Sequence, residues 1–287
     1  MGTGGCPRIF QRSFRVGTLG PPPLVILRCM GTNTKSRWFA GVPHQDSKEC
    51  ALYAFPHAGA GVTTVRRLCI ELSEAFDAFA VRLPGRESRV GEPMETVMPE
   101  LADKLADELL HHAQGRPVVL YGHCAGSTIA YEVARRLGPG RVRALVVSSH
   151  PAPGSVRREP TWALPRPDFL RQVVRDGYLP PQLLANGELL DIVEPALRAD
   201  YELIETYELK LYEGGAAEPV AVPTVAVYGR DDHTVDPARI DAWSALTTGP
   251  FRVVSLPGSH DLPSSRPADL AVAIRETLAD VLHAVAG

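Results

Sequence analysis

The sequence has no long apolar run and only a small net charge, and these absences exclude two classes of protein. No segment of the 287 residues approaches the roughly 20 consecutive apolar residues that a membrane-spanning helix needs. The formal net charge is −3, so the chain lacks the global basic field that binds nucleic acid. We therefore expect neither a membrane partner nor a nucleic-acid partner.

The chain also lacks the patterns typical of metal, disulfide and nucleotide sites. The five cysteines are odd in number and have no C-x-x-C spacing, which favours neither a disulfide framework nor a zinc site. His111 and His112 have no carboxylate or cysteine partner at ligand spacing. No P-loop or dinucleotide-binding fingerprint occurs. We expect a cytoplasmic protein that binds no metal and no cofactor of its own.

From about residue 49 onward, strand-like and helix-like segments alternate along the chain. This alternation predicts an α/β fold, in which a mostly parallel sheet is covered by helices on both faces. The expected strands cover residues 49–55, 78–83, 117–121, 142–149, 223–228 and 251–256, and the expected helices cover residues 63–76, 94–114, 127–137 and 267–285.

Residues 152–218 interrupt this alternation, because they contain helical patterns but no strand. A segment inserted between two sheet strands cannot join the sheet, so we expect it to fold over the carboxyl edge as a helical lid. Open α/β sheets bind their ligands at that edge, and a lid there controls access. A helical appendage with a merely structural role is the alternative. The core is then formed by residues 37–151 and 219–287.

The first 36 residues are expected to form an N-terminal extension. Residues 1 to about 29 show no amphipathic period, so part of the extension is expected to be disordered. Met30 offers an alternative start.

The most informative stretch is residues 122–126, Gly-His-Cys-Ala-Gly, between an expected strand and an expected helix. A small-residue turn in this setting is typical of the nucleophile elbow, G-x-S-x-G. The two glycines allow a sharp turn, which exposes the central side chain at the edge of the sheet. Here that side chain is a cysteine, Cys124, so we interpret it as the nucleophile.

An acid and a histidine follow later strands in the chain order that such a site requires. Asp231 and Asp232 come directly after the strand expected over 223–228, and His260 comes after the strand expected over 251–256. Only one of the two aspartates can point at the imidazole, and their spacing leaves both open.

Backbone N–H groups near the nucleophile are candidates for an oxyanion hole. The N–H of Ala125 follows from the elbow itself, and a second should come from the loop at residues 56–61, where we expect Ala58. Small residues there let the backbone approach a developing oxyanion closely. His57 and His123 flank this site and are interpreted as packing or hydrogen-bonding residues.

Several motifs then resemble one family. They are Phe-Pro-His-Ala-Gly-Ala-Gly at residues 55–61, Leu-Pro-Gly-Arg-Glu-Ser-Arg at 83–89 followed by Glu92-Pro93, Glu-Pro-Ala-Leu-Arg-Ala-Asp at 194–200, and Trp38-Phe39. Together they resemble the type II thioesterases of polyketide and nonribosomal peptide assembly lines, which have the α/β-hydrolase fold. The resemblance runs from about residue 37 to the C-terminus.

The resemblance implies hydrolysis of acyl groups from the phosphopantetheine thiol of acyl or peptidyl carrier proteins, by a monomer. The family's G-x-x-D pattern matches Gly229 to Asp232 and so implies Asp232 as the acid, and its histidine element implies His260. The implied catalytic triad is Cys124, Asp232 and His260, acting through an acyl-enzyme intermediate. The family usually has serine where Cys124 stands.

Cysteine at the nucleophile position leaves two enzymatic hypotheses open. A cysteine exchanges one thioester for another, so the acyl group on Cys124 can pass to water or to a second thiol or amine. The first outcome is editing hydrolysis, and the second is acyl or aminoacyl transfer to a second carrier protein. A non-catalytic, carrier-binding accessory protein is a third hypothesis. Dienelactone hydrolases also use cysteine on this fold, but their pattern lacks the Pro-Gly-Arg-Glu element and this lid.

Overall fold

The computed structural model describes Met1 and residues 36–43, 47–179 and 181–286. Met30 and almost all of the expected N-terminal extension lie outside the described residues. Within them, seven strands form one sheet in the order β1-β3-β2-β4-β5-β6-β7. β1 pairs antiparallel with β3, and the other neighbours are parallel, which confirms the predicted mostly parallel sheet. The strands are β1 (Phe39–Gly41), β2 (Ala51–Phe55), β3 (Asp77–Val81), β4 (Val118–His123), β5 (Val142–Ser148), β6 (Thr224–Gly229) and β7 (Phe251–Leu256).

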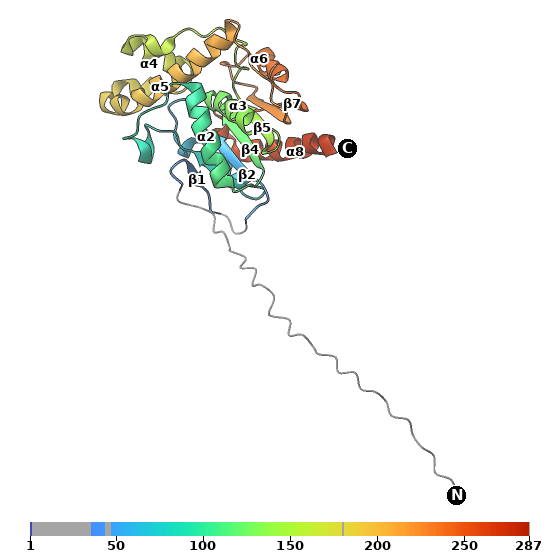
Figure 1. Cartoon of the computed structure of the whole chain (residues 1–287). Helices are drawn as coiled ribbons and strands as arrows, with labels where there is room; N and C mark the ends of the chain where they lie inside the picture. Colours follow the sequence, from blue (N-terminus) through green and yellow to red (C-terminus); the bar gives the residue numbers. More distant parts are fainter. Residues whose placement is uncertain (2–35, 44–46, 180, 287) are drawn as a thin grey trace. The chain divides into compact units, whose positions relative to one another are not determined.

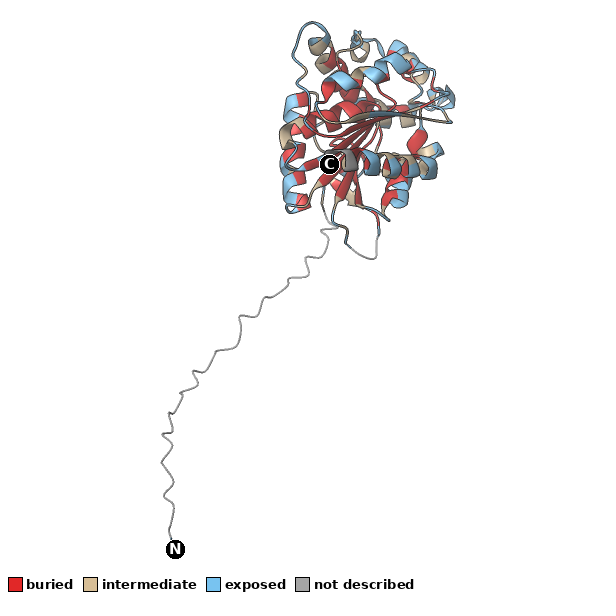
Figure 2. Cartoon of the chain, turned by 90° about the vertical axis from the view of Figure 1, so that its right-hand side faces the viewer, coloured by how far each residue is buried: buried red, intermediate tan, exposed pale blue. Residues whose placement is uncertain are grey.

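Helices cover both faces of the sheet, and the strands supply a separate core to each face. Along β2, Tyr53 and Phe55 point into one core, while Leu52 and Ala54 point into the other. This alternation follows from the two-residue period of a strand. Figure 2 shows the buried strands between helices whose outer faces are exposed. The first core is covered by α2 (Met98–Ala113) and α3 (Ala125–Leu137), and the second by α1 (Thr63–Leu72) and α8 (Pro267–Ala286).

Several boundaries differ from those expected from the sequence. The helix expected over 94–114 begins at Met98, because Pro99 fits only in the first turn, where a helix does not need its N–H. The helix expected over 63–76 ends at Leu72, and Ser73 closes it by bonding back to the Ile70 carbonyl. The three-residue β1 was not expected, because so short an edge strand leaves no periodic pattern in the sequence.

Between β5 and β6 the described residues form helices and no strand. These are η2 (Thr161–Ala163), α4 (Arg166–Arg175), η3 (Pro181–Ala185) and α5 (Gly187–Tyr212). α4 and α5 lie together above the sheet in the view of Figure 1. Near its C-terminal end α5 is anchored to α3, where the Tyr207 hydroxyl donates to Glu132. The shorter elements elsewhere are η1 (Glu87–Arg89), α6 (Pro237–Asp241), η4 (Ala242–Leu246) and α7 (Leu262–Ser265).

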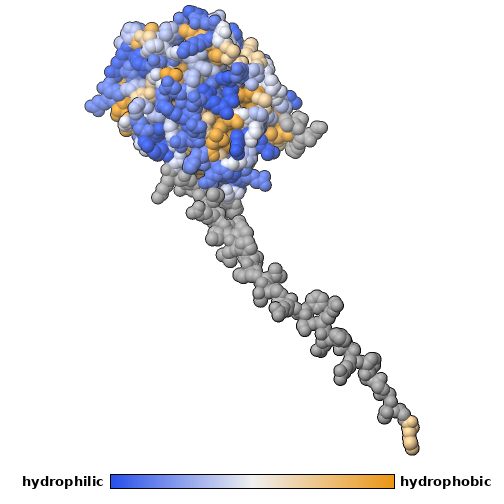
Figure 3. Space-filling model, in the orientation of Figure 1, coloured by the Kyte–Doolittle hydropathy of each residue, from blue (hydrophilic) through white to orange (hydrophobic). Residues whose placement is uncertain are grey.

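The surface of the described chain is mixed in character. The face drawn in Figure 3 is mostly hydrophilic, with apolar residues scattered among the polar ones. None of the helices in the described ranges combines the length and the apolar character that a membrane crossing needs.

Candidate active site

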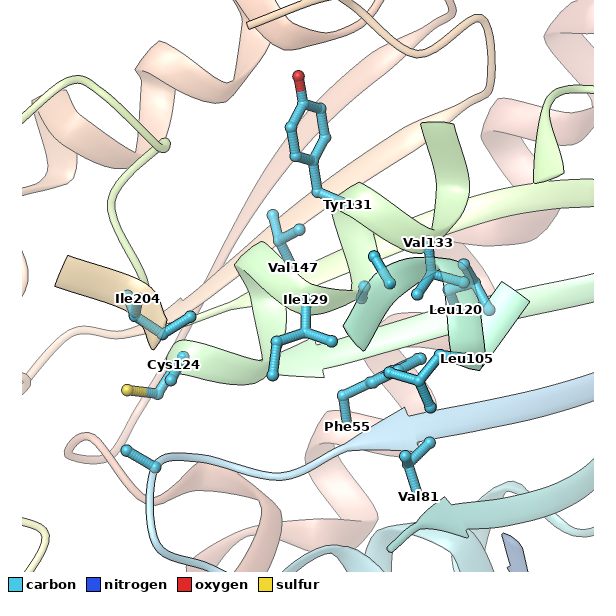
Figure 4. Packing of buried hydrophobic residues seen from close by; sticks show 14 of the residues in the cluster. Phe55, Val81, Leu105, Leu120, Cys124, Ile129, Tyr131, Val133, Val147 and Ile204 are labelled. Atoms are coloured by element: carbon cyan, nitrogen blue, oxygen red, sulfur yellow. The ribbon is translucent and has the colours of Figure 1, made fainter. Parts of the chain in front are cut away.

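Cys124 lies in the sharp turn between β4 and α3. Its backbone has φ 52° and ψ −127°, a conformation that residues other than glycine rarely adopt. The flanking glycines make this turn possible. A Cβ at Gly122 would lie 2.4 Å from the Gly126 carbonyl oxygen, and one at Gly126 would lie 2.4 Å from the Phe55 carbonyl oxygen. The Cys124 side chain is 1% exposed. Figure 4 shows its sulfur projecting from the start of α3, away from Ile129 and on the side where Ile204 lies.

The structure brings His260 and Asp232 together from the ends of two neighbouring strands. His260 Nδ1 and Asp232 Oδ2 lie 2.8 Å apart. The other Asp232 oxygen accepts from the N–H and the hydroxyl of Thr234, at 2.9 and 2.6 Å. Asp231 instead accepts from the Gly258 N–H at 3.0 Å and is exposed. Of the two adjacent aspartates, Asp232 is therefore the one that contacts the imidazole.

Cys124 and His260 are close enough to change each other's protonation. Burial alone would raise the pKa of the Cys124 thiol, but interactions with His150 and His260 outweigh burial and lower that pKa to about 6. Burial would lower the pKa of His260, but Asp232 and Cys124 raise it to about 10. At neutral pH the pair is a thiolate and an imidazolium, and the thiolate is the nucleophilic form. The N-terminus of α3, which begins at the next residue, adds a favourable dipole.

Tyr178, from the segment after α4, reaches the same sulfur. Its hydroxyl oxygen lies 2.7 Å from Cys124 Sγ, and its ring stacks on the ring of His57. Burial, followed by the nearby Cys124 charge, raises the pKa of Tyr178 well above its ordinary value. The phenol therefore stays protonated and can donate to the thiolate.

The two histidines flanking the site are uncharged at neutral pH. Burial is the main cause that lowers the pKa of His57 to about 4 and that of His123 well below its ordinary value. His123 Nδ1 lies 3.3 Å from the Ser148 hydroxyl, and its ring lies against His57 and His260. Both therefore pack around the site without carrying charge.

The expected oxyanion donors, Ala58 and Ala125, both line one cavity together with Cys124 and His260. Neither backbone N–H donates to another group in the described part of the chain. Two such N–H groups in the cavity that contains Cys124 are able to donate to an oxyanion formed there.

A buried ion pair holds the loop that carries Ala58. Arg86 donates two hydrogen bonds to Asp200 of α5, at 2.6 and 2.7 Å, and a third to the Ala60 carbonyl at 3.3 Å. Asp200 also accepts from the Gly59 N–H at 2.6 Å. The arginine of the Pro-Gly-Arg-Glu element therefore ties the loop to the inserted helices.

The cavity has a volume of about 400 Å³ and lies between the sheet edge and the inserted helices. Polar side chains from the inserted helices also line the cavity, among them Glu205. Burial raises the pKa of Glu205 to about 7. Where the chain is described, no group of three or more His, Cys, Asp or Glu side chains could hold a metal ion.

Sequence reasoning missed two residues at this site, His150 and Glu208. His150 is the second residue after β5, the strand beside the elbow strand. The rule that placed Asp232 and His260 at strand ends could have found it. Nothing in the sequence indicated Glu208, which lies on α5, because its contact with His150 depends on where that long helix packs.

Alkylation of Cys124 by iodoacetamide should rise as the pH passes through about 6 and then remain level through neutral pH. A thiol with a lowered pKa is deprotonated above that value, and the thiolate is the form that reacts. The rate is measured by mass spectrometry of the Cys124 peptide at a series of pH values, with Cys124→Ala as the control. A midpoint near the ordinary cysteine value, about 8.5, would contradict the thiolate–imidazolium pair.

Residues 51–278 match the family described as thioesterase domain. The chain is 28% identical over 231 residues to a probable cadicidin biosynthesis thioesterase of Streptomyces griseus, a match that covers 79% of this chain and 62% of that relative. The chain thus spans less than two thirds of that relative's length. It is 31% identical over 212 residues to the thioesterase PikA5 of Streptomyces venezuelae, covering 73% of this chain and 74% of that protein.

Among solved structures, the chain is similar to RedJ, a thioesterase from the prodiginine biosynthetic pathway in Streptomyces coelicolor. The two share 29% sequence identity with a TM-score of 0.71, and the match covers 83% of this chain and 95% of RedJ. The likeness therefore extends over nearly the whole of that protein.

Proposed function

The chain belongs to the thioesterase family, whose members hydrolyse thioesters, and from this premise we propose that it clears acyl groups from carrier proteins in polyketide or nonribosomal peptide biosynthesis. The carrier presents the acyl group on its phosphopantetheine thiol. The observation that carries the proposal is that Cys124 and the Asp232-bonded His260 line one cavity under the inserted helices. The biosynthetic thioesterases similar to this chain support the class of pathway.

In the first half-reaction the Cys124 thiolate attacks the thioester carbonyl carbon. The developing oxyanion is held by the N–H groups of Ala58 and Ala125, and the carbon–sulfur bond to the pantetheine breaks. The leaving sulfur takes the proton from His260, whose orientation Asp232 maintains. The products are a free carrier thiol and an acyl group on Cys124.

In the second half-reaction neutral His260 takes a proton from water, and the oxygen attacks the acyl carbon. The carboxylic acid leaves, and Cys124 returns as a thiolate beside the protonated imidazole. The proposed partners are acyl or peptidyl carrier proteins, and the proposed cofactor requirement is none, because the pantetheine arrives with the partner.

Transfer to a second carrier is the other candidate, and the cysteine favours it. An acyl group on sulfur keeps the free energy of a thioester, so exchange with another thiol is nearly isoenergetic and reversible. A serine would form an oxygen ester and lose that free energy. The same residues serve both reactions, since a thiol can replace water in the second half-reaction.

Intact-mass spectrometry of the protein mixed with an acyl-loaded carrier and an empty second carrier tests the proposal. Hydrolysis predicts a transient adduct on Cys124 and release of free acid. A long-lived adduct followed by the acyl group on the second carrier would support transfer and contradict simple hydrolysis. The absence of any Cys124 adduct and of acid would count against both.

A further inference from the structure

A second histidine, His150, faces the cavity beside Cys124 from the end of β5. It is 6% exposed. Ser149 before it has φ 51°, which is unusual for a residue other than glycine. The Ser149 N–H donates to the Val227 carbonyl, and the Trp243 indole N–H donates to the His150 carbonyl, both at 2.9 Å. The backbone is therefore held in a strained conformation that places the imidazole at the site.

The His150 ring is held by Glu208, a carboxylate on α5 that is 1% exposed. His150 Nε2 and Glu208 Oε1 lie 2.8 Å apart, and the same oxygen accepts from the Thr128 hydroxyl at 2.8 Å. The other oxygen accepts from Arg158 Nε at 2.6 Å. These partners hold the pKa of Glu208 at about 2 despite its burial, so the carboxylate is ionised.

His150 is therefore charged where burial alone would neutralise it. Burial lowers the pKa of His150, but the charge of Glu208 and the interactions with Cys124 raise it above its ordinary value. The other titratable groups that interact with Cys124 are His260, which is protonated, Tyr178 and Tyr201, which stay neutral, and the Arg158 guanidinium, which is charged. Cys124 thus lies within reach of two imidazolium groups, each backed by its own carboxylate.

We propose that His150 is a second catalytic histidine, which holds a positive charge beside the Cys124 sulfur while His260 transfers the proton. The inference rests on the proposed function, because it assigns a role in the two half-reactions at Cys124. His260 gives its proton to the departing pantetheine sulfur and is then free to take one from water. His150 gives up no proton in either step, because the Glu208 carboxylate stabilises the protonated imidazole.

The charge on His150 matters most when the acyl group leaves Cys124. In that step the bond from the acyl carbon to Sγ breaks, and the electron pair stays on the sulfur. At the start of this step His260 is neutral, so it cannot protonate the sulfur before it has taken a proton from water. A fixed cation beside Sγ stabilises the departing thiolate directly. The sulfur can therefore leave without the proton that His260 takes from water.

The first test is the pH profile of Cys124 alkylation in His150→Asn, which replaces the charged imidazole by a neutral amide. We expect the midpoint to move up by at least one pH unit, which lowers the alkylation rate near pH 6 by about fivefold or more. Glu208→Gln should move it in the same direction. His111→Asn, an exposed histidine on α2, is the matched control and should leave it unchanged. An unchanged midpoint in a folded His150→Asn protein would overturn the proposal.

His260→Ala provides a second test that leaves His150 and Glu208 intact. We expect its thiol still to titrate below the ordinary cysteine value, and the further change His150→Asn to remove that remainder. If His260→Ala alone restored the ordinary value, His150 would contribute no charge and the proposal would be wrong. This variant keeps the proposal testable if His150→Asn fails to fold.

Single-turnover mass spectrometry separates this inference from the proposed function. In His150→Asn, release of the acyl group from Cys124 should slow at least tenfold more than loading does, so the acyl-protein accumulates. Equal slowing of both steps would contradict the proposal. If the wild-type protein formed no acyl adduct, the proposed function would fail, whereas the alkylation profile would still report on His150.

Discussion

Replacing Cys124 by alanine should lower the release of acyl groups from a loaded carrier protein by about 10³-fold or more. Alanine removes the sulfur that we propose forms the acyl-enzyme bond, whereas the turn, the proposed oxyanion donors and His260 should keep their places. The measurement is free acid formed per minute, with the protein and the loaded carrier at fixed concentrations. A variant that retained wild-type turnover would show that Cys124 is not the nucleophile.

A second variant replaces Cys124 by serine, and its activities are compared with those of the wild-type protein. Cys124→Ser keeps a nucleophile in the elbow but converts the intermediate from a thioester to an oxygen ester. We expect hydrolysis to be kept or to increase and transfer to a second carrier to be lost, because the oxygen ester has already released the free energy of the thioester. Retained transfer in the serine variant would contradict this account of the sulfur.

Replacing Arg86 by alanine is expected to lower the free energy of unfolding by about 3–5 kcal/mol, because it leaves the buried Asp200 carboxylate without its charged partner. Arg86 is 7% exposed and Asp200 is 4% exposed, so water does not screen the loss. The quantity is measured by urea unfolding. Turnover should fall as well, since Arg86 and Asp200 hold the loop that carries Ala58.

The control for Arg86 is an exposed ion pair on the far side of the fold's core. Arg275 of α8 bonds to Glu74 at 2.9 Å near the surface. Arg275→Ala should change the free energy of unfolding by less than about 1 kcal/mol, as is usual for exposed pairs. Equal destabilisation by the two substitutions would show that burial of the Arg86 pair is not what makes it strong.

The order of strands and helices could be predicted because each element carries a local pattern. The apolar run at 117–121 and the small-residue turn after it predicted a strand followed by an elbow, and β4 and α3 stand there. The strand expected at residues 251–256 has those bounds in the structure. Strand ends also indicated where polar groups gather, so Asp231 or Asp232 could be placed near His260 from the sequence, and the family resemblance implied Asp232.

The rest of the site depends on contacts between distant segments, which no local pattern specifies. The pairing of Arg86 with Asp200 and that of His150 with Glu208 both require the position of α5 over the sheet. The choice between Asp231 and Asp232 depends on which one the turn directs to the imidazole and which one bonds to Gly258. Tyr178 was visible as an aromatic residue of the insertion, but nothing in the sequence placed its hydroxyl on the sulfur.

The depth of Cys124 has a consequence for the lifetime of the resting protein. A thiolate at neutral pH is the form that peroxides oxidise and that disulfides capture, so such a cysteine on the surface would be quickly lost. At 1% exposure Cys124 is out of reach of the disulfides of other folded proteins. A narrow thioester arm can still enter the cavity that contains it. Burial of Cys124 in a cavity thus admits a narrow substrate arm while it excludes capture by the disulfide of another folded protein.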